Sequence, residues 1–347
     1  MTQLGVTVPI LQTKMEKFSQ FAQLAEEARF DSVWGIEQYR NPFVVHALTA
    51  STTSRIKLAT GIAQAFSRSP FEMANAAADV DEISGGRTIL GIGPGGDDWL
   101  KSFHSTNGDR ALSRMSEYID VMRMSWEYHA KGAPGSLQYH GRHYTFEGMA
   151  GNPWGARNLI RPSIPIYIAA MRPKMIHMAA TKAEGIVSYS HTPEFAAAKV
   201  RPVIAQAAIA AGRDPQDVDY ACLTVCSVSN DRVEAMRRAR IQVGIYVAVD
   251  ITDPVIQFHG YQKEQMALRE AISSRGFESL ADVTPDYLVQ HFAIAGTPDE
   301  ARASLRRFQE SIPHVVLHPP YAAVLSAEES EDAFRNIVAT FGDQQHR

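Results

Sequence analysis

The sequence predicts an α/β fold, a closed (β/α)8 TIM barrel with two insertions, from three observations. Eight short apolar runs alternate with segments of helical periodicity, and this alternation requires a parallel sheet with right-handed crossovers. The chain has 347 residues, which is within the usual range for such a barrel. The alternation is interrupted at about 132–162 and 249–290. We therefore expect a single barrel domain over residues 1–347, with insertions after the fourth and seventh helical units.

The first half of the chain contains four strand–helix units. Ser69-Pro70-Phe71-Glu72 opens the third helix with a capping serine and with proline at the first helical position. A long fourth helix is predicted over 110–131. The strands are predicted at 4–10, 32–36, 56–62 and 88–93.

The second half resumes the same pattern after a segment rich in glycine, proline and aromatic residues, which we interpret as an inserted loop or hairpin. The later insertion is mixed and polar and is expected to contain helices of its own. Thr297-Pro298-Asp299-Glu300 and Ser326-x-x-Glu329 cap the two helices that flank the last strand. The strands of this half are predicted at 165–170, 185–189, 219–228 and 314–318.

Composition and charge favour a small-molecule enzyme. The net charge is −4, so no basic field recruits nucleic acid or anionic lipid. No apolar run is long enough to cross a bilayer, and the first residues lack the basic segment and cleavage site of a signal peptide. Cys222 and Cys226 lie on one face of a strand, too far apart for a disulfide, and are expected to be reduced core residues. We expect a cytoplasmic protein.

A glycine-rich strand end is the most distinctive local feature. Gly91, Gly93 and Gly96 match G-x-G-x-x-G, but three strand–helix units precede them and a long helix follows where an acidic second strand should lie. A dinucleotide site is therefore not favoured. Active sites of barrels lie at the carboxyl ends of the strands, so Gly93-Pro94-Gly95-Gly96 is predicted to contact a flat or anionic ligand. The alternative is an ordinary tight turn.

The same rule selects residues after the other strands, and it places the two insertions on this side if they follow strands, where they could form a lid. Metal binding is not predicted, because His140 with His143, and His314 with His318, lack acidic or cysteine partners. The selected residues are Glu37 and Gln38, Gly61 to Gln64, Gly93 to Asp98, Ala169 to Arg172, Tyr189 to His191, and His318 to Pro320.

Several motifs, taken in order, resemble those of the bacterial luciferase-like superfamily: residues 25–37, 53–62, Arg68-Ser69-Pro70 and 84–96. The resemblance covers nearly the whole chain. Gly91-Ile92-Gly93-Pro94-Gly95 and Val225-Cys226-Ser227-Val228 are similar to segments of the methylene-tetrahydromethanopterin reductase branch. The resemblance implies coenzyme F420, a deazaflavin that carries hydride. Other members of the superfamily bind reduced FMN and activate dioxygen.

The resemblance also implies cofactor-binding positions. A cis peptide bond that is not before proline is implied at Gly61-Ile62, behind the central ring of the flavin. Ala169, Ala170 and Met171 correspond to a phosphate-contacting turn at a helix start, where unpaired N–H groups and the helix dipole suit an anion. Arg172 could add a positive charge to that turn or be an ordinary surface arginine.

Acid–base chemistry is predicted near the second strand. Glu37 ends an apolar strand, where burial would raise the pKa of a carboxyl towards a useful range. The alternative is a buried ion pair with Arg68. Gln38 stands where the family usually has histidine, and glutamine cannot exchange a proton near neutral pH. Asp97 could supply the missing acid or be a solvated turn residue. Thr7 stands where the pterin reductases have glutamate, which weakens the case for a pterin substrate.

His318, at the mouth end of the last strand, and His291, near the end of the second insertion, are the predicted substrate-side histidines. The predicted function is hydride transfer between coenzyme F420 and a small organic substrate. One alternative is a monooxygenase that uses reduced FMN from a separate flavin reductase, and another is a non-catalytic flavin-binding protein. Relatives imply a homodimer.

Overall fold

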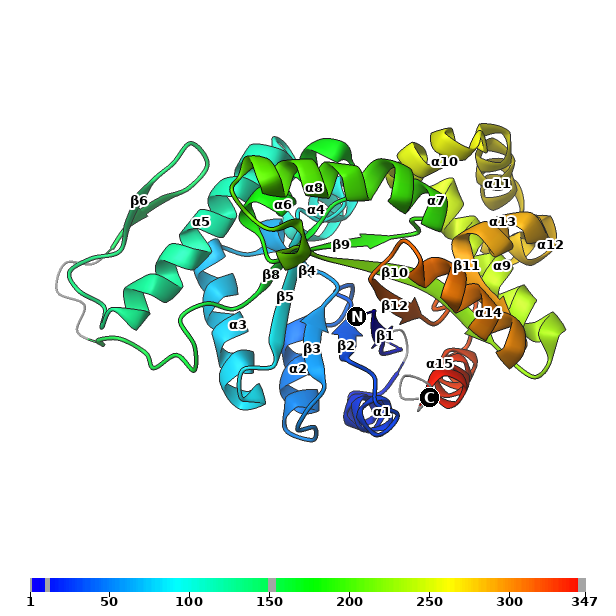
Figure 1. The fold of residues 1–347 in the computed structure, drawn as a ribbon, viewed down its shortest axis with the longest axis horizontal. Coiled ribbons are helices and arrows are strands. Elements are labelled where there is room, and N and C mark those ends of the chain that lie inside the picture. Colours follow the sequence, from blue (N-terminus) through cyan, green and yellow to red (C-terminus); the bar gives the residue numbers. More distant parts are fainter. Residues whose placement is uncertain (1, 10–12, 149–153, 343–347) are drawn as a thin grey trace.

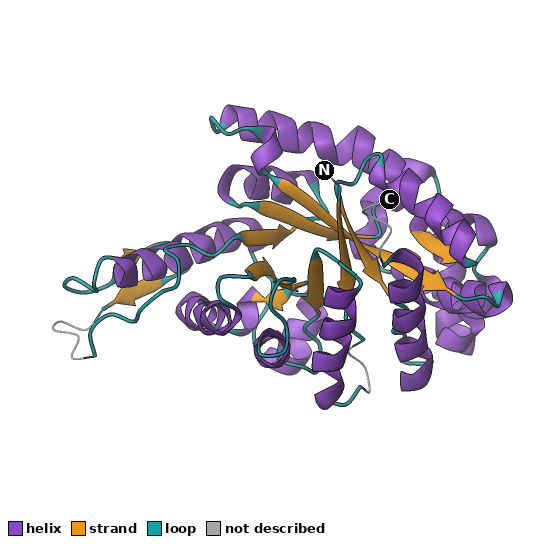
Figure 2. Ribbon diagram, turned by 60° about the horizontal axis from the view of Figure 1, so that its bottom comes forward, coloured by secondary structure: helices purple, strands orange, loops and turns teal. Residues whose placement is uncertain are grey.

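The computed structural model describes residues 2–9, 13–148 and 154–342. Eight parallel strands close into a barrel surrounded by helices (Figures 1 and 2), so the predicted fold class is confirmed. The register from β1 to its neighbours β12 and β2 is continuous, and pairing of β9 with β10 completes the ring. Around the barrel the strands are β1 (Gln3–Thr7), β2 (Ser32–Gly35), β3 (Lys57–Thr60), β5 (Thr88–Gly93), β8 (Ile166–Ala169), β9 (Gly185–Tyr189), β10 (Asp219–Val228) and β12 (His314–His318).

Two short strands extend this ring. The predicted strand 56–62 ends at Thr60, and after a cis peptide bond between Gly61 and Ile62 the chain forms β4 (Ala63–Gln64), which pairs with the end of β5. The cis bond expected at this position is confirmed. β11 (Ala293–Gly296) pairs with the outer part of β10 and was not predicted. Its four residues include two alanines and a glycine, which carry little strand propensity.

Several of the covering helices begin at the capping residues that the sequence indicated, although the first helix begins at Glu16 without a side-chain cap. Ser69 accepts a hydrogen bond from the N–H of Glu72, and complete capping boxes occur at Thr297 and Ser326. In the described ranges, none of these helices has both the length and the apolarity of a membrane span. The helices are α1 (Glu16–Glu27), α2 (Pro42–Ala50), α3 (Pro70–Ser84), α4 (Asp97–His104), α5 (Ala111–Ala130), α6 (Pro173–Lys182), α7 (Pro193–Phe195), α8 (Arg201–Ala210), α9 (Arg232–Ala248), α14 (Pro298–Gln309) and α15 (Ala327–Phe341).

Both insertions follow helices rather than strands. The second nevertheless lies beside the mouth, because its His259 Nε2 is 2.8 Å from Oγ1 of Thr192, which follows β9. The first contains an antiparallel hairpin, β6 (Gln138–His140) and β7 (Thr145–Glu147), whose turn is held on α5 by the carboxylate of Glu117. Figure 1 shows this hairpin projecting away from the barrel. The second insertion contains α10 (Asp253–His259), α11 (Gln262–Arg275), α12 (Leu280–Val283) and α13 (Asp286–Phe292), which confirms its predicted helical character.

The barrel interior is filled by one apolar layer between two polar ends. Trp34, Tyr167 and Leu223 are its largest members, and smaller residues from the other strands complete it. Cys222 and Cys226 point away from this interior towards the helices, where both are buried and free, as predicted. The layer fills the centre of the barrel and forms the floor of its open end.

A buried polar network closes the amino-terminal end of the barrel. The indole N–H of Trp34 donates to Ser32 Oγ (2.8 Å), and Ser32 Oγ lies 3.0 Å from His314 Nε2. His314 Nδ1 and the Tyr167 hydroxyl each lie 2.7 Å from Asp219 Oδ2. Burial alone would raise the pKa of Asp219, but these bonds lower it overall. The Ser–His–Asp order resembles a hydrolase triad, yet Ser32 is fully buried and accepts the Trp34 bond, so the network joins strands β2, β8, β10 and β12.

Removing the carboxylate at the end of this network tests its contribution. Asp219→Ala is expected to lower the free energy of unfolding by about 3–5 kcal/mol in urea titrations at about pH 7, because His314 and Tyr167 lose a buried charged partner. Asp217→Ala, two residues earlier and exposed, is the control and should stay within about 0.5 kcal/mol of the parent.

The same pair of variants has a defined pH dependence. The pKa of Asp219 is lower in the folded chain than in the unfolded one, so its stabilisation is complete above about pH 4 and is lost as the pH falls through the folded-state value. The difference between parent and Asp219→Ala should therefore narrow below about pH 4. An equal difference at both ends of this range would contradict a role for the ionised carboxylate.

Candidate active site

The carboxyl ends of the strands form an open mouth with an apolar arc along β3, β5 and β8. Ile62 and Ala169 are partly exposed there and pack on the interior layer. Gly93, at the end of β5, lies between them: a Cβ at this position would be 2.5 Å from Ile62 Cδ1 and 2.6 Å from Ala169 Cβ. Only glycine fits this approach. The three residues therefore pack closely together beside the cis peptide, with Ile62 and Ala169 partly exposed to the mouth.

Buried polar atoms without a hydrogen-bond partner in the described part of the chain also occur at the mouth. They include Gln64 Oε1 at the end of β4, and Ser190 Oγ and His191 Nε2 after β9. Ser190 has a φ of 54°, in the left-handed region that a non-glycine residue seldom adopts. Gly95 (φ 90°) brings the next turn against Gln64. Unsatisfied buried groups are costly, so these atoms suit a bound ligand or water.

Glu37 is held in a buried ion pair with Arg68, the alternative that the sequence left open. The guanidinium donates to both carboxylate oxygens, at 2.6 and 2.8 Å, and the Gln64 N–H donates to Oε2 at 2.6 Å. The Glu37 side chain is 7% exposed. Burial lowers the pKa of Arg68, but Glu37 raises it overall. The acid–base role predicted for Glu37 would require this ion pair to open.

Asp97 lies on the surface at the first turn of α4. Its carboxylate pairs with Lys101 at 2.5 Å and accepts the N–H of Gly108 at 2.9 Å. The Lys101 ammonium lowers the pKa of Asp97. This geometry favours the interpretation of Asp97 as a solvated turn residue.

The turn after β8 has the form expected of an anion site. Ala170 donates its N–H to Val187, and Met171 is buried. Arg172 is the N-cap residue of α6 with an exposed side chain, and its side chain makes no capping bond. The first N–H groups of α6 lack partners within the helix. An open groove of about 530 Å³ lies beside this helix start and is lined by Pro173, Lys174, His177 and residues of α5 and α8.

The two predicted substrate-side histidines occupy different environments. His318 is at the mouth but only 1% exposed, and burial lowers its pKa to about 3. Its Nδ1 lies 2.6 Å from Thr7 Oγ1, and its Nε2 lies 3.0 Å from the Tyr246 hydroxyl. His291 lies on α13, where its Nδ1 is 3.0 Å from the hydroxyl of Tyr261 at the start of α11. The structure thus groups His318 with mouth residues and His291 with the inserted helices.

Two tyrosines at the mouth were missed from the sequence. Tyr246 comes from α9. Tyr321 lies in the loop after β12, and its backbone N–H donates to Gln242 Oε1. The Tyr246 hydroxyl donates to that of Tyr321 at 3.2 Å, and Gln38 lies beside Tyr321. The barrel rule selected residues up to Pro320, one short of Tyr321. A helix residue such as Tyr246 carries no comparable signal.

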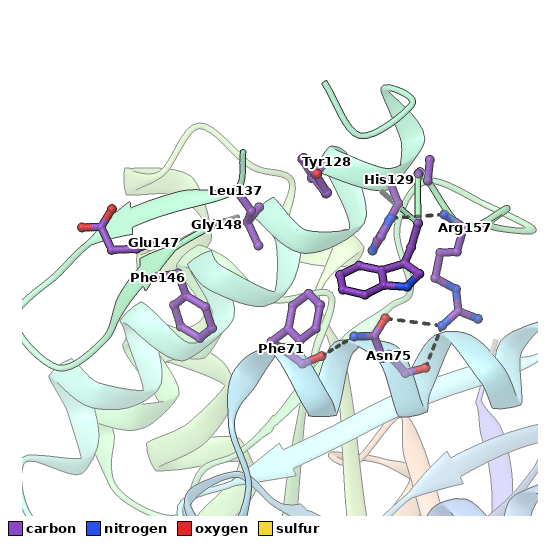
Figure 3. Close-up of a pocket in the computed structure, with 12 residues that line it drawn as sticks. Phe71, Asn75, Tyr128, His129, Leu137, Phe146, Glu147, Gly148 and Arg157 are labelled. Atoms are coloured by element: carbon purple, nitrogen blue, oxygen red, sulfur yellow. Dashed lines mark hydrogen bonds between the residues drawn. The ribbon is translucent and has the colours of Figure 1, made fainter. Parts of the chain in front are cut away.

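A second groove, larger than the one beside α6, lies elsewhere. It has a volume of about 580 Å³ and runs between α3, α5 and the projecting hairpin. Figure 3 shows Phe71 and Asn75 on α3, with Arg157 hydrogen-bonded to Asn75 across the groove. Since α3 and α5 cover the outside of the barrel, this groove is not the mouth. No group of three or more His, Cys, Asp or Glu side chains in the described ranges could hold a metal ion.

The comparison with protein families decides the assignment. The model of the luciferase-like monooxygenase family matches residues 3–314. The chain belongs to this family. Its resemblance to the bacterial luciferase-like superfamily, seen in the sequence, is therefore confirmed.

Relatives of this luciferase-like chain include reductases and monooxygenases. The chain is 32% identical over 300 residues to 5,10-methylenetetrahydromethanopterin reductase of Methanolobus tindarius, an alignment that covers 83% of this chain and 85% of the relative. The coenzyme F420-dependent tetrahydromethanopterin reductase of Methanopyrus kandleri has the same fold, with a TM-score of 0.81, 24% identity and 97% of each chain covered.

A further structural relative binds a different cofactor. The oxygenating constituent of 3,6-diketocamphane monooxygenase from Pseudomonas putida, solved with FMN, has a TM-score of 0.72 and 15% identity, with 99% of this chain and 97% of that one covered. Because its relatives are reductases and monooxygenases, the luciferase-like chain is an oxidoreductase.

A double-mutant cycle tests whether Glu37 is a structural partner of Arg68. Glu37→Gln and Arg68→Met should each destabilise the chain, and the double variant should be more stable than the sum predicts by about 1–3 kcal/mol, measured by urea unfolding. The exposed pair of Glu127 and Lys131 is the control cycle, with an expected coupling of about 0.5 kcal/mol. Coupling near zero between Glu37 and Arg68 would free the carboxylate for an acid–base role.

Proposed function

We propose that this luciferase-like oxidoreductase transfers hydride between coenzyme F420 and a small organic substrate. The observation that supports this most is the apolar arc of Ile62, Gly93 and Ala169, against which one face of a planar heteroaromatic ring could pack. Relatives named as F420-dependent enzymes add to this support, among them the Methanopyrus kandleri reductase. When bound, the deazaflavin supplies or accepts the hydride, and the chain needs to hold two planar partners in contact.

The residues present fit such a cofactor in three places. Ile62 and Gly93 would contact the ring, with Pro94, Gly95 and Gly96 continuing past it. The Ala170 N–H is already donated to Val187, so the backbone N–H groups of Met171 and of the start of α6 would bind phosphate, since the first N–H groups of a helix lack helical partners. Orphan polar atoms of Gln64, Ser190 and His191 would find partners at the mouth. Arg172 would supply a positive charge near the phosphate.

The same scaffold is compatible with FMN. The Pseudomonas putida enzyme shares the fold and was solved with FMN, so a reduced-FMN monooxygenase fed by a flavin reductase is the second candidate. The substrate is a small organic molecule rather than a pterin in our proposal, because Thr7 is committed to His318 where the pterin reductases have glutamate.

Equilibrium binding separates the two cofactors. Fluorescence titration of the apoprotein with coenzyme F420 should show micromolar or tighter binding, about −8 kcal/mol or more favourable, and weaker binding of FMN in both redox states. Preference for reduced FMN, with oxygen consumption, would identify a monooxygenase instead. Binding of either cofactor without turnover of any substrate would favour a non-catalytic flavin-binding protein.

Filling the apolar arc should impair cofactor binding. Gly93→Ala places a methyl group against Ile62 and Ala169, so we expect the affinity for coenzyme F420 to fall about tenfold or more. Gly108→Ala is the matched control, because its added methyl group meets nothing closer than 3.5 Å on a surface loop. Equal affinities for both variants in the same fluorescence titration would exclude this arc as the ring site.

A further inference from the structure

A chain of hydrogen bonds lines the side of the mouth opposite the apolar arc. It runs from Thr7 at the end of β1 to His318 at the end of β12 (2.6 Å), then to Tyr246 (3.0 Å) and on to Tyr321 (3.2 Å). Gln38, after β2, lies beside the Tyr321 hydroxyl and lowers its pKa, against the larger effect of burial. We call these five residues the polar arc. Around the barrel its strands, β12, β1 and β2, lie across the mouth from β5 and β8.

The direction of proton donation along the polar arc follows from its geometry. Tyr246 donates its hydroxyl proton to Tyr321, so the Tyr246 oxygen is left to accept from His318 Nε2–H. A histidine protonated at Nε2 is neutral with a free lone pair at Nδ1, which accepts the Thr7 hydroxyl proton. Burial lowers the pKa of His318 to about 3, which agrees with this neutral form. The Thr7 hydroxyl, His318 Nε2–H and the Tyr246 hydroxyl therefore each donate to the next residue of the chain, which ends at Tyr321.

Tyr321 is the outward end of this chain. Burial raises the pKa of Tyr321 overall, so the hydroxyl keeps its proton, while Tyr246 and Gln38 act in the opposite direction. Its oxygen accepts the hydrogen bond of Tyr246. Among the residues that the structure describes, none accepts the Tyr321 hydroxyl proton in return. Tyr321, Tyr246 and Tyr189 are partly exposed at the mouth, whereas His318 lies behind them. The one uncommitted proton of the polar arc thus sits on the residue that a substrate can reach.

The other acid candidates at the mouth are less suitable. Both oxygens of Glu37 accept hydrogen bonds from Arg68, and Asp97 pairs with Lys101 on the surface. Gln38 holds no exchangeable proton near neutral pH. The site therefore lacks a free carboxylic acid at the positions that the sequence suggested.

Resting on the proposed hydride transfer, we propose that the Tyr321 hydroxyl binds the substrate heteroatom and gives it a proton, and that the substrate is an aldehyde, ketone or imine. Tyr246 and His318 are positioning residues that act through Tyr321. This assigns to the loop after β12 the task that the family's histidine would perform at Gln38.

The electrons and protons of this step balance. The carbon of the C=O or C=N group receives a hydride from the reduced deazaflavin, which is oxidised while the substrate is reduced. The π pair of the double bond moves to the heteroatom, and the Tyr321 O–H bond breaks as its proton forms the new O–H or N–H bond. The phenolate is held by the donors of Tyr246 and Gln38 and regains a proton from water once the product leaves.

Kinetics of Tyr321→Phe test the proton donor. The variant retains the ring and loses only the hydroxyl, so we expect its affinity for coenzyme F420 to be unchanged and its single-turnover rate of carbonyl reduction to fall about 100-fold or more. Tyr287→Phe is the matched control, because it also loses one hydroxyl bond, to Glu264, but on the exposed face of α13. A Tyr321→Phe rate equal to that of the control would overturn the proposal.

Binding of isobutyramide gives a readout that needs no turnover. This unreactive carboxamide presents a carbonyl oxygen like that of the substrate, and saturation-transfer NMR can follow it with or without cofactor. Tyr321→Phe should weaken its binding about tenfold, the loss of one hydrogen bond, and Tyr287→Phe should not. Binding that does not depend on Tyr321, or no binding to the parent chain, would overturn the proposal. This measurement tests whether Tyr321 binds a carbonyl oxygen even if coenzyme F420 does not bind and the proposed function fails.

Two further outcomes distinguish the parts of the proposal. If the parent binds coenzyme F420 but reduces no member of a panel of aldehydes, ketones and imines, the cofactor assignment stands and the substrate class is wrong.

Tyr246→Phe should slow hydride transfer in the parent and have no further effect in Tyr321→Phe, since it acts through that hydroxyl. Additive effects of the two substitutions would show that Tyr246 acts independently.

Discussion

The interior of an eight-stranded barrel must be filled, and each polar group that enters it must find a partner. Strand β12 carries this constraint most visibly, because His314 and His318 lie four residues apart and both point inward. Each histidine is the centre of a hydrogen-bond chain in which it receives a hydroxyl bond on one nitrogen and donates from the other. The apolar layer around Trp34 separates the two chains. The arrangement of the whole interior follows from this one strand.

The two hydrogen-bond chains end on different groups. The chain at the amino-terminal end contributes to stability, whereas the chain at the mouth can contact a ligand. At the amino-terminal end the donors converge on Asp219, whose carboxylate has no proton to give and is mostly buried. At the mouth the chain ends on Tyr321, a partly exposed hydroxyl that still has its own proton. In the first chain, the final acceptor, the Asp219 carboxylate, is occupied by His314 and Tyr167. The second leaves one donor for a ligand, which is what a site for a polar double bond requires.

The barrel and its capped helices could be predicted because they depend on local periodicity and on motifs that are continuous in sequence. The cis bond at Gly61 was implied only by the resemblance to the luciferase-like superfamily. The sequence left two interpretations of Glu37, an acid–base group or an ion-pair partner of Arg68. Deciding between them requires the positions of Arg68 and the Gln64 N–H, about one strand–helix unit away in the sequence. Tyr246 and Tyr321 could not be found, because their hydroxyls meet across 75 residues. The β11 strand was missed because pairing with β10, not its own composition, makes it a strand.

The departures from the family pattern fall on one side of the mouth. Thr7 and Gln38, which stand where relatives are expected to have glutamate and histidine, both belong to the polar arc, and one is bonded to His318 while the other reaches Tyr321. The family-like motifs at Gly61 and Gly93 line the opposite, apolar side. A ring bound on the apolar side would meet the same surface as in relatives, whereas its substrate would meet different donors. Under the proposed function, differences confined to the polar arc would change the substrate and leave the cofactor surface as it is in relatives.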